Sequence, residues 1–390
     1  MRILFIHSTP VPPALDPRAN RFALLSSRLV GDVLQPIWFR TPGEVEAALG
    51  PGSYPVYTVG NFRYHWFLIR RPGLRYKLAQ LWFYVSEGLR LHRQQKYECI
   101  VCYAHMLTGL CGVFLKLLTR AKLIVEIATS PRLAYLTRHS KVTLRDRLMR
   151  LYSDICLHIS LWSCDRVHLL SAEPLAPYPL LRRVRASIFP EFVPVGVVPR
   201  AAEAEDETYV LLVGAPWRIK GVDLLIAAFR RLAPDFPAVK LKLLGWFPDR
   251  EHLEALAGGS PQIEILKPRP NPEVLEITSR AAIFALPSRC EGTPVVVLEA
   301  MASGVPVVAS DIAGIPSLVR DGDSGFLVPV GNVEMLEARL RRLLSDRDLR
   351  KRMGARGYEI AHSEFNETLY VEKFARMVAD AIQGSERASP

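Results

Sequence analysis

Two glutamates, Glu291 and Glu299, are separated by seven residues in the segment EGTPVVVLE. Carboxylates accept hydrogen bonds from hydroxyl groups, so the pair could hold a polyhydroxylated ligand. Thr293 suits the N-cap of a helix and Pro294 its first position, because proline has no N–H to leave unpaired there. Gly304 suits the residue just past the helix end. We therefore expect Glu291 in a loop and Glu299 on the helix.

The start of this helix could also receive an anion. Its first N–H groups have no partner within the helix and carry roughly half a positive charge, so the amides of Gly292, Thr293 and Val295 could bind phosphate oxygens. At about 1.5 Å per residue, Glu299 lies roughly 7 to 8 Å along the axis, a depth suited to ribose hydroxyls. On spacing alone, two solvated glutamates, one in a loop and one on a helix face, are an equally good interpretation.

A second group of candidate residues lies in GAPWRIKG, residues 214–221. Arg218 and Lys220 stand at the start of a predicted helix, where side-chain charge and the helix dipole act on the same anion. The segment directly follows the apolar run TYVLLVG, which indicates a buried strand. We therefore expect phosphate binding in this loop.

The elements around these residues alternate between strands and helices along the whole chain. The run AAIFALPS at 281–288 indicates a buried parallel strand directly before Glu291. This order predicts an α/β protein with two doubly wound, Rossmann-like domains that face a cleft. We place the first domain at 1–195 and the second at 205–367, with a Pro-containing and then acidic linker at about 190–207.

The segment Ser288–Pro329 resembles the signature block of family 4 retaining glycosyltransferases. In that block two glutamates separated by seven residues precede EAMA-x-G-x-PVVA, a Gly-Ile-Pro turn and DG-x-x-G-x-L-V. The resemblance is weaker in the rest of the C-terminal half, and the first half matches only in pattern. It implies the GT-B fold, in which the last helix, here 368–383, crosses back onto the first domain.

The resemblance implies a retaining transfer of sugar from a nucleoside diphosphate sugar to an acceptor hydroxyl, with no further cofactor. Glu299 would bind the ribose, and Glu291 would be the catalytic carboxylate at the sugar ring. Lys220 matches the family's diphosphate-binding lysine. The family's arginine position is Ala215 here, and we expect Arg218 to reach the same phosphates instead.

The acceptor side departs from the family. Val195 and Ala128 stand where the family has asparagine and histidine. His105 follows the predicted strand ECIVCY, where the family often has another histidine, although a packing role is the plainer interpretation. We expect a lipid-linked or polymeric saccharide as acceptor, in the synthesis of cell-surface polysaccharide or glycolipid.

Two D-x-D pairs could be mistaken for a metal site. Asp321 and Asp323 lie in a predicted turn, and Asp346 and Asp348 lie beside a predicted helix end, so turn and surface roles are preferred. We predict that no metal is required, and that cationic side chains and helix ends offset the charge of the leaving diphosphate instead.

The composition agrees with a cytoplasmic two-domain enzyme. The chain has 390 residues and is 49% hydrophobic, enough for two cores, but holds only six cysteines. Cys99 and Cys102 form a C-x-x-C within a predicted strand, which favours buried structural thiols over a zinc site. The first residues do not read as a signal peptide, and charges interrupt every apolar run before the ~20 residues of a membrane span.

The net positive charge of the chain comes from its first half. Residues 1–200 hold 27 Lys and Arg against 12 Asp and Glu, whereas residues 201–390 hold 23 against 27. Two basic segments, 61–97 and 132–150, could lie on the anionic cytoplasmic face of a membrane. A solvated face with its aromatics turned inward, and nucleic-acid binding, are the alternatives, although no nucleic-acid motif is present. The first segment also carries aromatic residues, namely Trp66, Phe67, Trp82, Phe83 and Tyr84.

Two other classes of protein fit part of the pattern. A sugar-nucleotide epimerase of the same architecture would act on its donor without an acceptor, but it is not expected to carry this signature block. A non-catalytic, membrane-bound partner protein that binds a sugar nucleotide would explain the departures in the first half.

Overall fold

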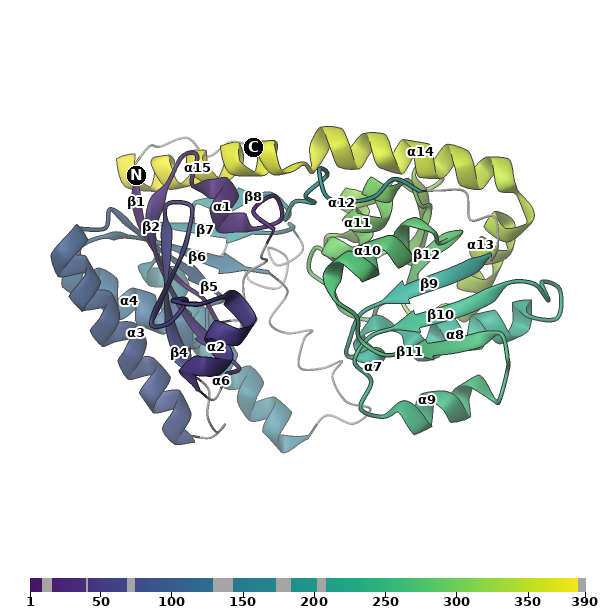
Figure 1. The fold of residues 1–390 in the computed structure, drawn as a ribbon, viewed down its shortest axis with the longest axis horizontal. Coiled ribbons are helices and arrows are strands. Elements are labelled where there is room, and N and C mark those ends of the chain that lie inside the picture. Colours follow the sequence, from purple (N-terminus) through teal and green to yellow (C-terminus); the bar gives the residue numbers. More distant parts are fainter. Residues whose placement is uncertain are drawn as a thin grey trace. The chain divides into compact units, whose positions relative to one another are not determined.

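The computed structural model describes residues 1–8, 16–39, 41–68, 74–128, 143–172, 184–201 and 208–384. The chain forms two compact units, each an α/β structure with its own sheet (Figure 1). The first unit comprises Met1–Ala128, Leu148–Phe189 and Thr368–Pro390, and the second comprises Thr129–Arg147 and Pro190–Glu367.

The sheet of the first unit has eight strands in the order β3-β4-β2-β1-β5-β6-β7-β8. All neighbouring strands are parallel except β3 and β4, which are antiparallel. The strands are β1 (Arg2–Ile6), β2 (Val30–Ile37), β3 (Val56–Val59), β4 (Phe62–Leu68), β5 (Cys99–Tyr103), β6 (Lys122–Ile127), β7 (Arg166–Leu169) and β8 (Ala186–Ile188).

The helices of the first unit pack on both faces of this sheet. Leu4 of β1 shares a buried core with Leu115 of α4 and Leu157 of α6, and α3 contributes Tyr84 to the same core. The next residue, Phe5, points to the opposite face, since side chains alternate along a strand, and stacks on α15. The helices are α1 (Arg21–Leu25), α2 (Pro42–Leu49), α3 (Leu74–Gln95), α4 (Leu107–Thr119), α6 (Leu144–Ser163) and α15 (Glu367–Gln383).

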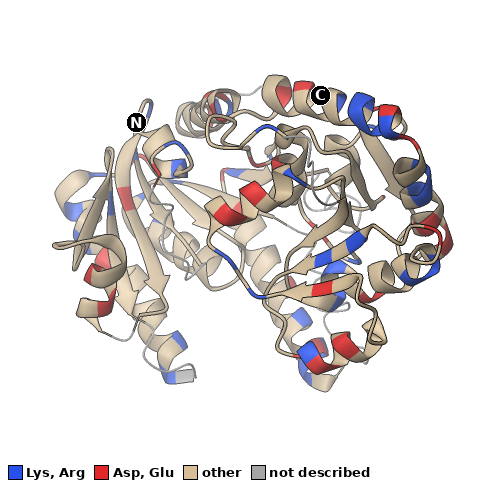
Figure 2. Ribbon diagram, turned by 45° about the vertical axis from the view of Figure 1, so that its right-hand side comes forward, with Lys and Arg blue, Asp and Glu red and all other residues tan. Residues whose placement is uncertain are grey.

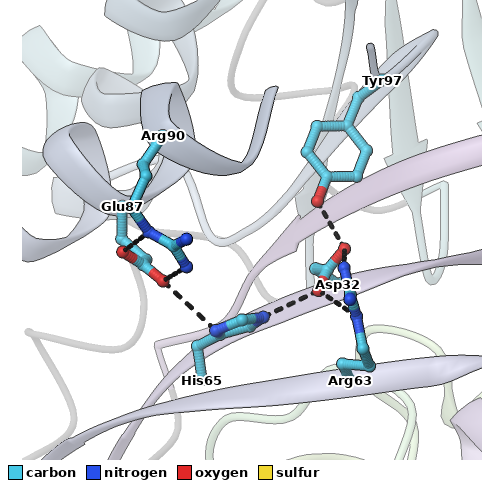
Figure 3. A network of polar contacts seen from close by, with 6 residues as sticks. All are labelled: Asp32, Arg63, His65, Glu87, Arg90 and Tyr97. Atoms are coloured by element: carbon cyan, nitrogen blue, oxygen red, sulfur yellow. Dashed lines mark hydrogen bonds and ion pairs between the residues drawn. The ribbon is translucent and has the colours of Figure 1, made fainter. Parts of the chain in front are cut away.

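A buried polar network fastens α3 to the first sheet (Figure 3). The carboxylate of Asp32 accepts hydrogen bonds from Arg63 at 2.9 and 3.1 Å and from the hydroxyl of Tyr97. The Nε2 atom of His65 lies 2.7 Å from Asp32, and its Nδ1 atom lies 3.2 Å from Glu87 of α3. Burial favours a high pKa for Asp32, but the hydrogen bonds outweigh it and the pKa is lowered. The network lies toward the amino-terminal ends of β2 and β4, so we assign it a structural role.

The second sheet has six parallel strands in the order β11-β10-β9-β12-β13-β14. From β9 the chain adds β10 and β11 on one side of the sheet. It then returns to the other side of β9 and adds β12, β13 and β14. The neighbours β9 and β12 therefore flank a topological switch point. Its strands are β9 (Tyr209–Val213), β10 (Lys240–Leu244), β11 (Ile263–Leu266), β12 (Ile283–Leu286), β13 (Val307–Ser310) and β14 (Gly325–Val328).

The helices of the second unit bury apolar faces against this sheet and expose mixed charge. Figure 2 shows acidic and basic residues interleaved along its helices, and pairs such as Arg341 with Asp235, at 2.6 Å, are largely exposed. Such exposed ion pairs each contribute about 1 kcal/mol at most to the free energy of unfolding. The helices are α7 (Trp217–Lys220), α8 (Val222–Leu232), α9 (Arg250–Ala257), α10 (Asn271–Ser279), α11 (Val295–Ser303), α12 (Ile315–Leu318), α13 (Val333–Ser345) and α14 (Arg347–Glu364).

The boundary between the units differs from the predicted one. The first unit ends at Phe189, and the described part of the predicted linker 190–207, up to Ala201, clusters with the second unit. The N–H of Val193 donates to Phe365 O at 2.9 Å, and the N–H of Ala201 donates to Ser303 O at 2.6 Å. These backbone bonds, which proline content does not reveal, make the segment part of the second unit. Residues 202–207 lie outside the described residues.

Candidate functional site

The loop after β12 and helix α11 carry the two signature glutamates. Glu291 lies in the loop and Glu299 in α11, as the sequence predicted. The helix begins one residue later than expected, because Pro294 has an extended backbone (ψ 111°) and is itself the N-cap. Gly304 ends the helix with φ 84°, a left-handed conformation that a glycine adopts without a steric penalty.

An ion pair joins the two predicted groups of site residues. Lys220, at the end of α7, donates to Oε1 of Glu291 at 2.7 Å, and the hydroxyl of Ser288 donates to the same oxygen at 2.6 Å. Glu291 is only 8% exposed. The loops after β9 and β12 meet here because these strands are neighbours at the switch point, where ligands bind in open parallel sheets.

Two glycines allow this close approach. Gly214 has φ 142°, and a Cβ there would lie 3.1 to 3.3 Å from the side-chain carbons of Lys220. Gly221 has φ 70°, and a Cβ there would lie 2.0 Å from the carbonyl oxygen of Pro287. Gly221 therefore lets the loop after β9 pack against the end of β12, and Gly214 leaves room for the side chain of Lys220.

Arg289 clamps the signature loop onto the helices after β9. Its guanidinium donates to both carboxylate oxygens of Asp223 at 2.7 Å and to the carbonyl of Arg218 at 2.7 Å. Its backbone N–H donates to Ile219 O at 2.7 Å. We did not predict Arg289 or Asp223 from the sequence, since the signature motif does not mark them and they are 66 residues apart.

Arg218 is close to this site in the chain, but its side chain makes no ion pair within the described residues. Its Nε atom is buried and lacks a hydrogen-bond partner there. The structure thus brings Lys220 together with Glu291 and leaves the guanidinium of Arg218 available for another group.

Glu299 is a buried carboxyl group without a partner. It is 9% exposed, and no described residue forms a hydrogen bond or ion pair with it. Burial raises its pKa to about 7, because removing water disfavours the charged form. Buried polar groups are nearly always hydrogen-bonded, so this one fits a group whose partner is a ligand.

The backbone before α11 adds hydrogen-bond donors. The N–H groups of Gly292 and Val295 donate no hydrogen bond within the described part of the chain, whereas the carbonyl of Gly292 accepts from Gly314 at 2.9 Å. Thr293 is buried beside them. This geometry can bind an anion next to Lys220.

His105 belongs to the first unit. It is buried, and its Nε2 atom is 2.8 Å from the hydroxyl of Ser153 on α6. Its carbonyl accepts from Ser160 at 3.0 Å, and burial lowers its pKa to about 4. These contacts are those of a packing residue, and its acceptor-side role stays a prediction.

A charged cluster that the sequence analysis missed lies at the carboxyl edge of the first sheet. Glu126 of β6 is 3.2 Å from Arg21 and 2.8 Å from Nδ1 of His168. Burial alone would raise the pKa of Glu126, but the charge of Arg21 and the hydrogen bonds with His168 and Arg21 outweigh it and lower the pKa to about 2. The guanidinium of Arg21 also lies over the rings of Tyr370 and Phe374 on α15. The cluster therefore holds α15 on the first unit.

The D-x-D aspartates take local structural roles. Asp321 accepts from the N–H of Leu327 at 2.9 Å, Asp323 pairs with Arg356 at 3.1 Å, and Asp346 caps α14. Within the described ranges, no group of three or more His, Cys, Asp and Glu side chains could hold a metal ion. Cys99 and Cys102 are free, buried thiols, as predicted.

The aromatic side chains of the basic segment 61–97 differ in how far they are buried. Trp66 and Tyr84 are buried, Phe67 and Phe83 are half-buried, and Trp82 is 73% exposed. Residues 132–142 of the second basic segment lie outside the described residues. Among the helices that are described, we find none with the length and apolarity required to span a bilayer.

The part of the chain that carries this site is similar to proteins of known family. Residues 198–360 match the family model described as glycosyl transferases group 1. Alpha-maltose-1-phosphate synthase of Mycolicibacterium smegmatis is 37% identical over 172 residues, which cover 40% of this chain and 44% of that protein. The chain spans only 22% to 44% of the length of the first curated relatives that it matches.

Solved structures share the fold over the full chain. Sucrose-phosphate synthase from Thermosynechococcus elongatus is similar with a TM-score of 0.81 and 18% identity, covering 99% of this chain and 100% of that one. Anabaena HepE in complex with UDP-glucose is similar with a TM-score of 0.71 and 16% identity, covering 97% and 100%. The solved structures show that the chain has the fold of two Rossmann-like domains, and residues 198–360 are similar to a glycosyl transferase domain.

Proposed function

We propose that this protein is a retaining glycosyltransferase that moves a sugar from a nucleoside diphosphate sugar to an acceptor hydroxyl. The observation that carries the proposal is the Lys220–Glu291 ion pair at the switch point of the second sheet, formed directly before the helix α11 that holds the unpartnered Glu299. The likeness to HepE, whose structure contains UDP-glucose, supports a nucleotide-sugar donor.

The donor would bind on the second unit. Glu299 would accept hydrogen bonds from the ribose hydroxyls, which would supply the partner that this carboxyl group lacks. Lys220 and Arg218 would contact the diphosphate. Lys220 has three N–H donors, so it can keep its bond to Glu291 while it donates to a phosphate oxygen.

In the transfer, the bond between the anomeric carbon and the diphosphate breaks and the acceptor oxygen bonds to that carbon on the same face. The leaving phosphate would take the acceptor proton. Glu291, with the amides of Gly292, Thr293 and Val295, would orient the sugar ring. Cationic side chains and the start of α11 would offset the charge on the leaving diphosphate without a metal.

We propose a lipid-linked or polymeric saccharide as the acceptor, used in cell-surface polysaccharide or glycolipid synthesis in the cytoplasm, because the first half of the chain is strongly basic. His105 is the candidate residue on the acceptor side.

Turnover of a panel of nucleoside diphosphate sugars tests the proposal. Glu291→Gln and Lys220→Ala should each lower kcat by about a hundredfold or more, because each removes a preorganised charge at the reacting centre. Arg341→Ala, which removes an exposed ion pair of the same unit, is the matched control and should leave turnover unchanged. Full transfer activity in Glu291→Gln would show that the catalytic assignment is wrong.

The products distinguish the other two classes. An epimerase would give a new sugar nucleotide without an acceptor, and a binding protein would bind the nucleotide without donor hydrolysis or transfer. Retention is checked by the anomeric configuration of the product in an NMR spectrum.

A further inference from the structure

The outward surface of α3, α4 and α6 is apolar. These three helices share one buried core against a single face of the first sheet, so each has an opposite side that turns away from it. Figure 1 shows α3 and α4 side by side in this layer, and Lys116 of α4 donates to Ser163 O of α6 at 2.8 Å. Most of the exposed large hydrophobic side chains in the described part of the chain lie on these helices.

Helix α6 is apolar on its outward side as well as on its inward side, where Leu157 and Leu161 join the core. Its inward side also includes Ser153, whose hydroxyl lies 2.8 Å from Nε2 of His105, and Ser160, whose hydroxyl donates to the carbonyl of His105. Its outward side carries large apolar residues at helical spacing, from Leu148 to Trp162, which is 82% exposed. A surface helix normally places charged and polar residues there. The outward residues are Leu148, Leu151, Ile155, Ile159 and Trp162.

The other two helices continue this surface. On α3, Leu78 and Trp82 lie on one stripe with Arg75 and Arg93, since their spacings of three, four and eleven residues keep them on one side of a helix. On α4, Phe114, Leu117 and Leu118 are exposed. We call the outward side of these three helices, between Leu78 and Trp162, the outer helical face.

The charge on this layer is positive and uncompensated. Three acidic residues of this layer are paired internally: Glu87 with Arg90 at 2.5 Å, Asp154 with Arg150 at 3.8 Å and Asp165 with Lys116 at 2.5 Å. Four of its exposed basic residues form no ion pair within the described residues. They are Arg75, Lys77, Arg93 and Arg120.

We infer that the outer helical face docks on the surface of an anionic lipid bilayer. Its leucines, isoleucines and tryptophans would enter the boundary between headgroups and acyl chains, while the unpaired arginines and lysines would contact anionic headgroups. A second copy of the chain fits less well, because a symmetric contact would bring the same uncompensated cations together. The inference does not depend on the proposed donor chemistry. It also extends the docking surface beyond the predicted basic segments 61–97 and 132–150, onto α4 and along α6 as far as Trp162.

Vesicle sedimentation of the full chain tests this inference. Wild-type protein should sediment with phosphatidylcholine vesicles that contain phosphatidylglycerol, and less with phosphatidylcholine alone or at raised salt. The variant Ile155→Gln with Trp162→Gln should bind about tenfold more weakly, since two inserted side chains are lost. Trp246→Gln is the matched control, because Trp246 is 68% exposed but lies on the second unit, and it should bind like wild type.

The charge contribution has its own variant. Arg75→Glu with Arg93→Glu should abolish the preference for phosphatidylglycerol, and circular dichroism should show an unchanged fold because both side chains are exposed. Failure of the wild type to bind, or equal loss in Trp246→Gln, would overturn the inference. A wild-type dimer in analytical ultracentrifugation that the α6 variant converts to monomer, without vesicle binding, would instead assign the face to a second copy. Nucleotide binding, measured on the same variants, should not change, which separates this inference from the proposed function.

Discussion

At the scale of single residues, Glu299 combines burial, a missing partner and a high pKa. Its pKa of about 7 in the folded protein lies above the ordinary value of 4.5. The folded state therefore binds this proton more tightly than the unfolded state does. As a result, the free energy of unfolding falls as the pH rises from about 4.5 through 7, where Glu299 becomes charged in its buried site. Keeping the Glu299 carboxylate buried without a partner would therefore lower the stability of the ligand-free protein at neutral pH.

Substitution of Glu299 by Gln should make the ligand-free protein more stable at high pH. Because a neutral amide has no charge to desolvate, we expect a gain of about 1–3 kcal/mol near pH 8 and little change near pH 4.5. Urea-induced unfolding of the second unit, measured at both pH values, checks this. If the free energy of unfolding depended on pH identically in wild type and Glu299→Gln, the raised pKa of Glu299 would be contradicted.

Nucleotide binding should release a proton from Glu299. Hydrogen bonds from ribose hydroxyls favour the carboxylate, so its pKa should fall when the donor binds near pH 7. Calorimetry of UDP binding in two buffers of different ionisation enthalpy measures this release. In Glu299→Gln the buffer dependence should disappear and the affinity should drop about tenfold. Proton release that persists in the variant would assign the titrating group elsewhere.

At the scale of elements, the bond between Arg289 and Asp223 sets the position of the signature loop relative to α7 and α8. Arg289 is a positioning residue, since its guanidinium contacts Asp223 and a backbone carbonyl rather than Glu291 or Lys220. A displacement of about 1 Å at a reacting centre can cost a hundredfold in rate. The clamp therefore gives the Lys220–Glu291 pair its geometry.

Arg289→Ala should lower kcat by about tenfold or more while nucleotide affinity changes less, because the loop loses its support but keeps Lys220 and Glu299. Asp223→Ala should have a similar effect, and the double variant should be no worse than either single one. Arg289→Lys should restore only part of the activity, since an ammonium cannot bond a carboxylate in the bidentate manner of a guanidinium. If the losses in kcat of Arg289→Ala and Asp223→Ala simply added in the double variant, the two residues would not act together to position the loop.

At the scale of the whole molecule, the chain returns to its first unit at the end. Phe374 of α15 stacks on Phe5 of β1 with ring centroids 5.9 Å apart and is fully buried. The same helix covers Arg21, which is paired with Glu126. The first unit is therefore assembled from the beginning and the end of the sequence.

Phe374→Ala should destabilise the first unit alone. Loss of a buried phenylalanine costs about 3–5 kcal/mol, so the unfolding transition of the first unit should move to lower temperature. The transition of the second unit should stay in place, and UDP should raise only that second transition, since the proposed donor site lies there. Differential scanning calorimetry with and without UDP separates the two. If Phe374→Ala lowered the unfolding temperatures of both units equally, the prediction that the two units unfold independently would be wrong.

Much of the local structure could be read from the sequence. The apolar run before Glu291, the position of Glu299 within a helix and the end of that helix at Gly304 depend on hydrophobic patterning and turn chemistry, which act over a few residues. The predicted start of α11 was one residue early, because proline fits both the N-cap and the first helical position and only the ψ of Pro294 decides between them.

The sequence by itself determined the alternation of strands and helices, the signature block and the chemical types of its candidate ligands, because these follow from short-range pattern. The tertiary structure decided which residues meet. Lys220 reaches Glu291 across 71 positions because β9 and β12 are neighbours at the switch point, and strand order is a long-range property. It also decided that Trp66 is buried while Trp82 and Trp162 are exposed, since exposure depends on the partner that each helix or strand acquires.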